Sequence, residues 1–144
     1  MVSSADVLSR LRAINDTAAF NRWCGIEVVD ASPGFATIAM PWRSEVGQYS
    51  SFLHAGLIGA LIDTACGFAA ATTTDRVLAS HFSVNCLRPA VGERFIAKAH
   101  VVKPGKTQIF TSCELFAQGG DSEKLVATGE TLLLVVAAID STSQ

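Results

Sequence analysis

Residues 48–71, QYSSFLHAGLIGALIDTACGFAAA, predict the central element of this protein. The stretch begins with polar and turn-forming residues, and from Ala55 to Ala71 it is an apolar or small-residue segment of helical length. A helix that is apolar on every side is a buried helix. Asp63 is the one carboxylate inside it, and a carboxylate there is costly unless it is paired, hydrogen-bonded or used in chemistry. The stretch therefore predicts a buried central helix with a candidate functional carboxylate.

Small residues line one side of this predicted helix. At three- and four-residue spacing, which brings side chains onto one helical face, the sequence places Gly56, Gly59, Ala60, Asp63, Cys66, Gly67 and Ala70. Each glycine inside a helix costs about 1 kcal/mol relative to alanine, so the stripe requires a reason. Either a ligand approaches the backbone beside Asp63, or the helix packs tightly against a neighbouring element that also caps Asp63. Helical geometry alone leaves both explanations open.

The spacing of His54 and Asp63 predicts a second subunit. The two residues are nine positions apart, which is about 13.5 Å along a helix. Their side chains therefore cannot meet within one helix. If both serve one site, another copy of the chain must bring them together, which predicts a dimer with its site between subunits.

The order of motifs resembles the hotdog-fold acyl-CoA thioesterases, in particular their PaaI-like branch. Gln48 stands six residues before His54-Ala55-Gly56, where the branch usually has His-Gly-Gly, and Asp63 stands at the family's Asp or Glu position. NCLRP (85–89), VVKPGK (101–106) and LVATGETLLLV (125–135) resemble the family's later strands. The similarity covers about residues 20–138. It implies a hotdog fold, hydrolysis of acyl-CoA thioesters, and a homodimer or dimer of dimers (homotetramer).

The resemblance also implies roles for the residues around the helix start. Asp63 would be the nucleophile or general base, and the backbone N–H of Ala55, in place of the usual glycine, would receive the developing oxyanion. First-turn amides have no partner within a helix, and the helix dipole favours negative charge there. Gly56 keeps the second glycine of the motif. His54 would orient the loop or bind the thioester carbonyl, and Gln48 would touch the thioester or the attacking water.

A second departure from the family pattern is Gly67, one turn after the carboxylate, where related enzymes often carry a Ser or Thr that holds the water. Thr64, Ser80 or Ser83 are possible substitutes, and Gln48 alone is another. The sequence gives no ground for choosing among them.

Basic residues near two turns are candidates for binding the phosphates of coenzyme A. The family resemblance suggests Arg88, before Pro89, and Lys103 and Lys106, around a Pro-Gly turn. Ordinary solvated turn lysines explain the same pattern equally well. Coenzyme A would enter as part of the substrate, and no other cofactor and no metal is implied.

Strands are expected around the central helix. An amphipathic helix is predicted over residues 4–20, with a serine as its cap, and strands over 25–30, 35–41, 77–87, 93–103, 108–117 and 125–138. Pro104-Gly105 suits the centre of a type II turn, which predicts a hairpin. One buried helix against five or six antiparallel strands is an α+β architecture. We expect one domain over residues 1–144, with its core at about 21–138.

Composition excludes several classes of function. The 144 residues are 49% hydrophobic and 17% charged, and so apolar a composition suggests extra burial in an oligomer. The net charge of −2 argues against nucleic-acid binding. Neither a membrane span nor a signal-peptide core is recognised, so a cytoplasmic protein is expected. The four cysteines have no C-x-x-C pair, which disfavours a disulfide framework, a zinc site and a catalytic Cys66.

Two other functions remain open from the sequence. A hotdog hydratase or dehydratase of acyl thioesters also uses a histidine and a carboxylate near a helix, within a different surrounding motif. A non-catalytic acyl-CoA-binding module would fit the departures at Ala55 and Gly67. No G-x-S-x-G elbow, zinc-protease motif, phosphate loop or dinucleotide fingerprint is present.

Overall fold

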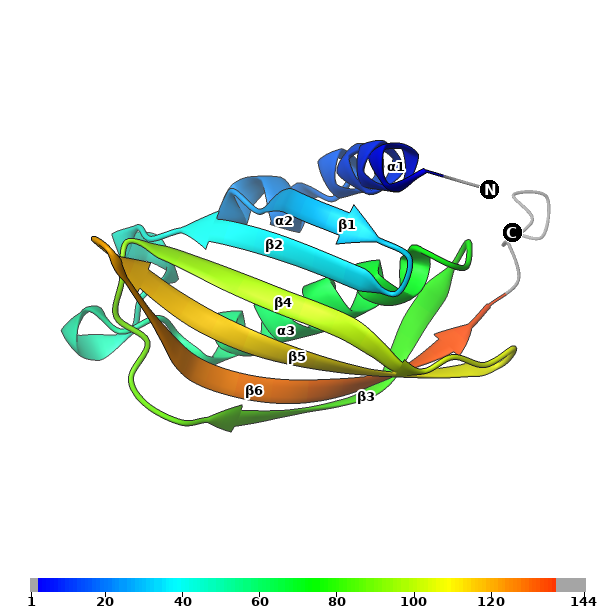
Figure 1. The fold of residues 1–144 in the computed structure, drawn as a ribbon. Helices are drawn as coiled ribbons and strands as arrows, with labels where there is room; N and C mark the ends of the chain where they lie inside the picture. The colour runs from blue at the N-terminus through cyan, green and yellow to red at the C-terminus, as the bar shows by residue number, and fades with distance from the viewer. Residues whose placement is uncertain (1–2, 137–144) are drawn as a thin grey trace.

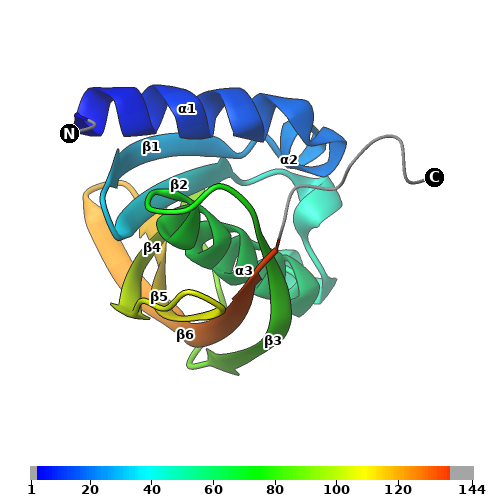
Figure 2. The same ribbon diagram turned by 90° about the vertical axis from the view of Figure 1, so that its right-hand side faces the viewer.

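The computed structural model describes residues 3–136 and consists of a six-stranded antiparallel sheet curved around one long helix (Figure 1). The helix is α3 (Ala55–Ala71). The strands are β1 (Glu27–Ser32), β2 (Phe35–Pro41), β3 (Val77–Cys86), β4 (Arg94–Lys103), β5 (Gln108–Gly119) and β6 (Ser122–Val135). Their order across the sheet is β1-β2-β4-β5-β6-β3, so β1 and β3 are the two edges. Figure 2 looks along this arrangement and shows the sheet wrapping α3.

Helix α3 has the predicted bounds and is the centre of the hydrophobic core. Leu61, Ile62 and Ala65 are completely buried, because the sheet curves around them. A Cβ on Gly129 of β6 would lie 2.7 Å from Cγ2 of Ile62. Glycine at this position therefore lets the helix and the sheet approach each other closely.

The N-terminal segment forms two helices where one was predicted over residues 4–20. Helix α1 (Ser4–Thr17) is capped by the Ser3 side chain, which accepts a hydrogen bond from the N–H of Asp6. Ala18 then adopts an extended backbone with φ −91° and ψ 112°, and α2 (Ala19–Cys24) follows. The predicted single helix is therefore wrong at this break. The break allows α1 to lie along the edge strand β1, as Figure 2 shows.

The predicted strands are present, with ends that differ by a few residues. Strand β2 has the predicted bounds, while β6 begins three residues before its predicted start at 125. Its predicted end at residue 138 lies outside the described residues. The hairpin of β4 and β5 is confirmed, but the type II turn is not, because Gly105 lacks the positive φ that such a turn requires.

Edge strand β3 is mostly exposed. Its two longest exposed hydrophobic side chains, Leu78 and Phe82, are 60% and 48% exposed. It pairs with β6 on one side and with no other strand of residues 3–136. Among these same residues no helix is both long and apolar enough to cross a membrane.

Candidate functional site

His54 is the N-cap of α3. Its Nδ1 accepts a hydrogen bond from the backbone N–H of Gly56 at 2.8 Å. An accepting Nδ1 is unprotonated, so the neutral ring carries its proton on Nε2. The side chain is exposed, and the Nε2–H is therefore available to donate a hydrogen bond to a carbonyl oxygen. Capping fixes the tautomer that such a donor requires.

Ala55 is the first residue of α3 and its amide is free. Within the described part of the chain, no oxygen accepts a hydrogen bond from this N–H, and the residue is exposed. Unpaired amides at a helix N-terminus attract negative charge, and the helix dipole adds to this effect. The amide has the properties needed to stabilise an oxyanion.

Gln48 lies in the loop that leads into His54. Its backbone N–H donates to the carbonyl of Phe52 at 2.7 Å, and its side-chain Nε2 lies 3.5 Å from the carbonyl oxygen of Leu53. Between these contacts Ser50 and Ser51 have φ values of 62° and 63°. A left-handed conformation costs a non-glycine residue roughly 1–2 kcal/mol. The loop thus holds Gln48 beside the helix start at some cost in backbone strain.

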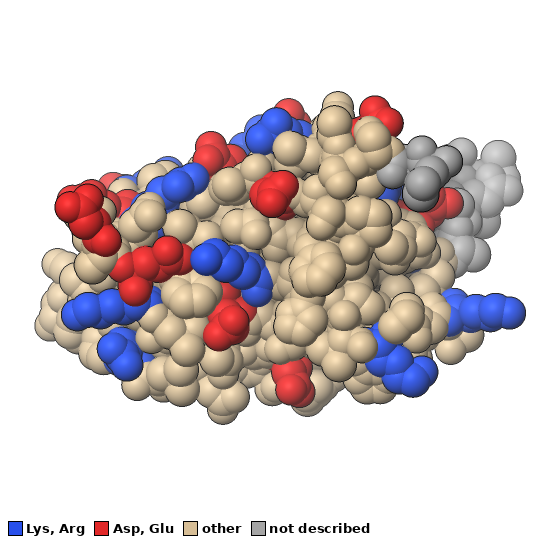
Figure 3. Space-filling view, viewed as in Figure 1, with Lys and Arg blue, Asp and Glu red and all other residues tan. Residues whose placement is uncertain are grey.

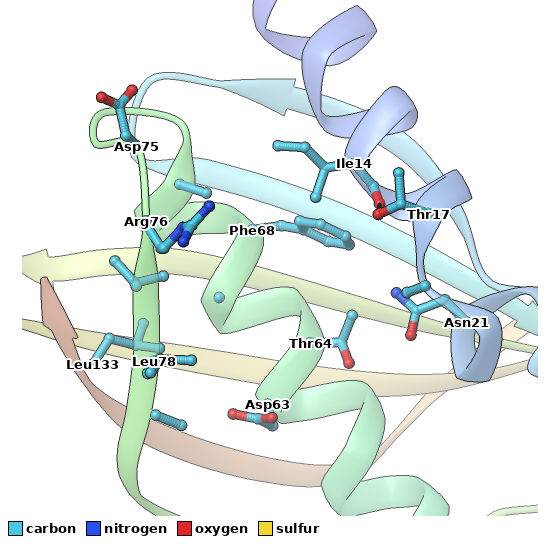
Figure 4. A pocket seen from close by; sticks show the side chains of 15 residues that line it. Ile14, Thr17, Asn21, Asp63, Thr64, Phe68, Asp75, Arg76, Leu78 and Leu133 are labelled. Carbon is cyan, nitrogen blue, oxygen red and sulfur yellow. Dashed lines mark hydrogen bonds between the residues drawn. The ribbon is translucent and has the colours of Figure 1, made fainter. Parts of the chain in front are cut away.

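Asp63 lies in the wall of a cavity of about 550 Å³ (Figure 4). The residue is half-buried, and burial raises the pKa of its carboxyl above the ordinary value of 3.8. No hydrogen bond or ion pair within residues 3–136 compensates for this desolvation. A half-buried carboxylate without a partner is typical of a functional group and costly as a purely structural one.

The cavity is bounded by α1, α3 and β3. Figure 4 shows Asp63, Thr64 and Phe68 on α3 facing it, with Ile14 of α1 on the opposite side. Gly67 also lines the cavity, and a Cβ at this position would meet no atom within 4 Å. The volume is in the range of small-molecule sites in proteins. The N-terminal helix therefore contributes a wall of the cavity as well as covering the sheet edge.

The predicted catalytic residues fall into two groups within one chain. Asp63 lines the cavity, whereas Gln48, His54, Ala55 and Gly56 do not. Asp63 and His54 stand at different heights of α3, about 13.5 Å apart along the axis. One chain alone does not bring the two groups together.

The small-residue stripe of α3 has several roles. Cys66 is completely buried and does not line the cavity. It lies against Cys113 of the sheet, and a hydrogen bond with Cys66 together with burial raises the pKa of the Cys113 thiol. A Cβ on Gly59 would lie 3.3 Å from the ring of Phe82. Tight packing therefore explains Cys66 and Gly59, while Asp63 and Gly67 face open space.

The three hydroxyl residues that were candidates for holding the water lie in different places. Thr64 lines the cavity beside Asp63. Ser80 does not; its Oγ donates to the carbonyl of Leu132 at 3.3 Å, at a bulge between Ala79 and His81. Ser83 lines a different, smaller cavity of about 260 Å³. Among these three hydroxyls, only Thr64 shares the cavity with Asp63.

The candidate phosphate-binding residues lie at opposite ends of α3. Arg88 belongs to the loop whose Ala90 carbonyl accepts from Leu53 N–H, near the start of the helix. Lys106 lines a shallow pocket with Thr73 and Thr74, just beyond the end of the helix. These ends are about 25 Å apart for a helix of 17 residues. Lys103 is on the same hairpin as Lys106, so one chain does not gather all three cations.

The sequence did not predict that Ile14, Asn21, Phe68 and Arg76 would line the cavity. The apolar stripe of the predicted N-terminal helix indicated that Ile14 would be buried, but Ile14 is 40% exposed and faces the cavity. Nothing in the spacing identifies Arg76, because its position depends on how β3 pairs with β6. Within residues 3–136 no group of three or more His, Cys, Asp or Glu side chains is placed to hold a metal ion.

Comparison with known proteins identifies the family. The pattern of the thioesterase superfamily matches residues 51–124. Acyl-coenzyme A thioesterase 13 of Homo sapiens is 31% identical over 123 residues, covering 83% of this chain and 86% of the human protein.

Two solved structures have the same fold. A thioesterase family protein from Silicibacter pomeroyi has a TM-score of 0.85 at 31% identity, over 94% of this chain and 100% of that one. The E. coli PaaI protein from the phenylacetic acid degradation operon also has a TM-score of 0.85, at 22% identity, over 93% and 96% of the two chains. The chain belongs to the thioesterase superfamily and is a hotdog-fold thioester hydrolase.

Proposed function

We propose that this protein hydrolyses acyl-CoA thioesters to the free acid and coenzyme A, with Asp63 as the nucleophile or general base. The observation that carries the proposal is the half-buried Asp63 carboxylate, which lines a cavity without any partner among residues 3–136. The relationship to an acyl-coenzyme A thioesterase supports the choice of substrate.

The proposed site lies between two subunits. Edge strand β3 presents unpaired backbone groups and exposed Leu78 and Phe82, and such an edge is a ready template for pairing with another chain. A two-fold axis beside β3 would run the two α3 helices antiparallel. The start of the partner's helix would then approach the middle of α3, where Asp63 is.

Each residue has a chemical role in this site. Asp63 either takes a proton from the water that attacks the thioester carbonyl carbon, or attacks that carbon itself to give a mixed anhydride, which water then hydrolyses to the free acid. The Ala55 N–H of the partner subunit stabilises the developing oxyanion, as unpaired helix amides do. His54 of the partner subunit donates its Nε2–H to the same carbonyl, with Gln48 of the partner subunit beside it. The thiolate of coenzyme A leaves and is protonated, and the acyl group occupies the cavity next to Gly67 and Phe68.

A further surface would suit a dimer of dimers. The outer face of the sheet has an uncharged area over its central and right-hand part, with charged side chains around it (Figure 3). Phe35, Val102 and Phe110 are 58%, 60% and 45% exposed. Exposed apolar patches of this kind mark interaction sites, so we propose that two dimers associate through this face.

Release of free thiol from a panel of acyl-CoA thioesters tests the activity. We expect hydrolysis by the wild type and a loss of about a thousandfold in Asp63→Ala, in the range expected for losing a general base. Circular dichroism and sedimentation must show both proteins folded and equally associated. Unchanged turnover in Asp63→Ala would remove Asp63 from the mechanism, and binding without turnover by the wild type would indicate an acyl-CoA-binding module.

Subunit complementation tests the shared site. Asp63→Ala and His54→Ala would each have about a hundredth of wild-type activity or less alone, and their co-expressed mixture would contain heterodimers with one intact site. Because half of the dimers are mixed and one of their two sites is intact, about a quarter of wild-type activity is expected in a symmetric dimer. No recovery in proven heterodimers would place the whole site within one subunit.

A further inference from the structure

Arg76 is the one cationic side chain among the residues that line the Asp63 cavity. The guanidinium has no hydrogen-bond acceptor and no carboxylate partner among residues 3–136. In Figure 4 it is turned toward Phe68 and Ile14, across the cavity, while the neighbouring Asp75 carboxylate is turned away from them. The cavity is therefore lined by two carboxylates, Asp63 and Asp75, and by the Arg76 guanidinium, which forms no ion pair with either of them.

The backbone of Arg76 is held by the sheet. Its carbonyl accepts a hydrogen bond from Val136 N–H at 3.1 Å, and the next residue, Val77, pairs with Val135 of β6. The start of the side chain is thus fixed at the end of the cavity. Four other arginines, Arg10, Arg12, Arg22 and Arg94, donate to carbonyl or carboxylate oxygens, whereas the Arg76 guanidinium makes no such bond within the described residues.

Between Asp63 and Arg76 the cavity runs along α3. Gly67 and Ala71 lie one and two turns beyond Asp63 and line it, and Ala71 is about 12 Å from Asp63 along the helix axis. Phe68 and Leu133 provide apolar wall in the same region. An acyl chain with its thioester at Asp63 would lie against this wall, with its far end near Arg76.

We infer that this enzyme prefers acyl thioesters that end in a carboxylate, and that Arg76 is the residue that recognises the distal carboxylate. The inference rests on the proposed function, because it takes Asp63 as the position of the thioester. Guanidinium and carboxylate form paired, charge-assisted hydrogen bonds, and arginine is less strongly hydrated than lysine and suits partly enclosed sites. Arg76 is exposed in the single chain, so water hydrates its guanidinium when a methyl-terminated chain is bound, whereas a distal carboxylate would replace that water with charge-assisted hydrogen bonds.

The test compares thioesters of equal chain length that end in a carboxylate or in a methyl group: adipoyl against hexanoyl, suberoyl against octanoyl, and sebacoyl against decanoyl coenzyme A. The readout is the ratio of kcat/KM for the two members of a pair. We expect a ratio above one for at least one pair in the wild type. Arg76→Gln should lower that ratio roughly tenfold or more, in keeping with the loss of a hydrogen bond to a charged group. Arg76→Lys should lower it less.

Lys124→Gln is the matched control, because Lys124 is an exposed cation outside the cavity, and it should leave the ratio unchanged. A wild type that favours the methyl-terminated member of every pair would overturn the inference. So would an Arg76→Gln variant whose KM rises equally for both members, since that would assign Arg76 to coenzyme A. A wild type that hydrolyses none of the thioesters would instead overturn the proposed function.

Discussion

Nδ1 of His54 accepts a hydrogen bond from the N–H of Gly56, two residues along the chain, at 2.8 Å. This one contact caps α3 and assigns the imidazole proton to Nε2. Helix capping and the proposed polarisation of the substrate would therefore use opposite sides of the same ring, so a substitution can separate them.

Replacement of His54 by Asn should keep the cap through Oδ1 and withdraw the outward donor, because the shorter Asn amide does not extend to the position of Nε2. Asn is among the best N-cap residues, so the melting temperature should stay near that of the wild type while kcat/KM falls about a hundredfold, as for loss of one oxyanion donor. His54→Ala should lose activity to a similar degree and also about 1 kcal/mol of stability. Thermal melts and thiol release on both variants check this. Full activity in His54→Asn would leave His54 with a capping role only.

The pH dependence of activity should report the Asp63 carboxylate. Asp63 must be ionised to act as nucleophile or base, and burial raises its pKa above 3.8. We therefore expect kcat/KM to fall on the acid side with an apparent pKa above that value. A profile from pH 3 to 8 measures it, and a stability control at each pH separates titration from unfolding. An acid limb at or below 3.8 would mean that donors from the partner subunit outweigh burial.

The same carboxylate should reduce stability at neutral pH. Because the pKa of Asp63 is raised on folding, the folded state binds the proton more tightly than the unfolded state does. The contribution of Asp63 to the free energy of unfolding is therefore most favourable at low pH. It becomes less favourable as pH rises from the pKa of the unfolded state through that of the folded state. Asp63→Asn should raise the melting temperature at pH 7, and the increase should shrink as pH falls toward 4. A lower melting temperature for Asp63→Asn at pH 7 would contradict the unpaired state of this group.

The parts of the fold that the sequence could predict are those with a local signal. Helix α3 was predicted with its correct ends, because an uninterrupted apolar segment with a single carboxylate has few other structures open to it. Strand β2 was also predicted correctly, since the Pro33-Gly34 turn precedes it and Gly34 takes a φ of 84°. The break at Ala18 carries no such signal, because alanine is a strong helix former and its extended backbone serves the packing of α1 on β1.

The site was predictable only in part, for a related reason. His54 caps α3, Ala55 begins it and Asp63 lies within it. Their separation along the helix could therefore be derived from the sequence. Arg76 and Ile14 meet α3 at the cavity through the pairing of β3 with β6 and the path of α1. These are long-range contacts that no spacing within the sequence records.

Gly129 and Gly67 differ in the space that surrounds them, and this difference predicts opposite effects of alanine on stability. A Cβ on Gly129 would lie 2.7 Å from both the carbonyl oxygen of Ser83 and Cγ2 of Ile62, whereas a Cβ on Gly67 would meet nothing within 4 Å. Gly129→Ala should therefore cost about 1–3 kcal/mol, as overpacked cores do. Gly67→Ala should gain up to about 1 kcal/mol from helix propensity. Thermal or urea unfolding of the two variants measures both. Destabilisation by Gly67→Ala would mean that the partner subunit fills the space beside Asp63, which would make that space part of the dimer contact and not of the acyl site.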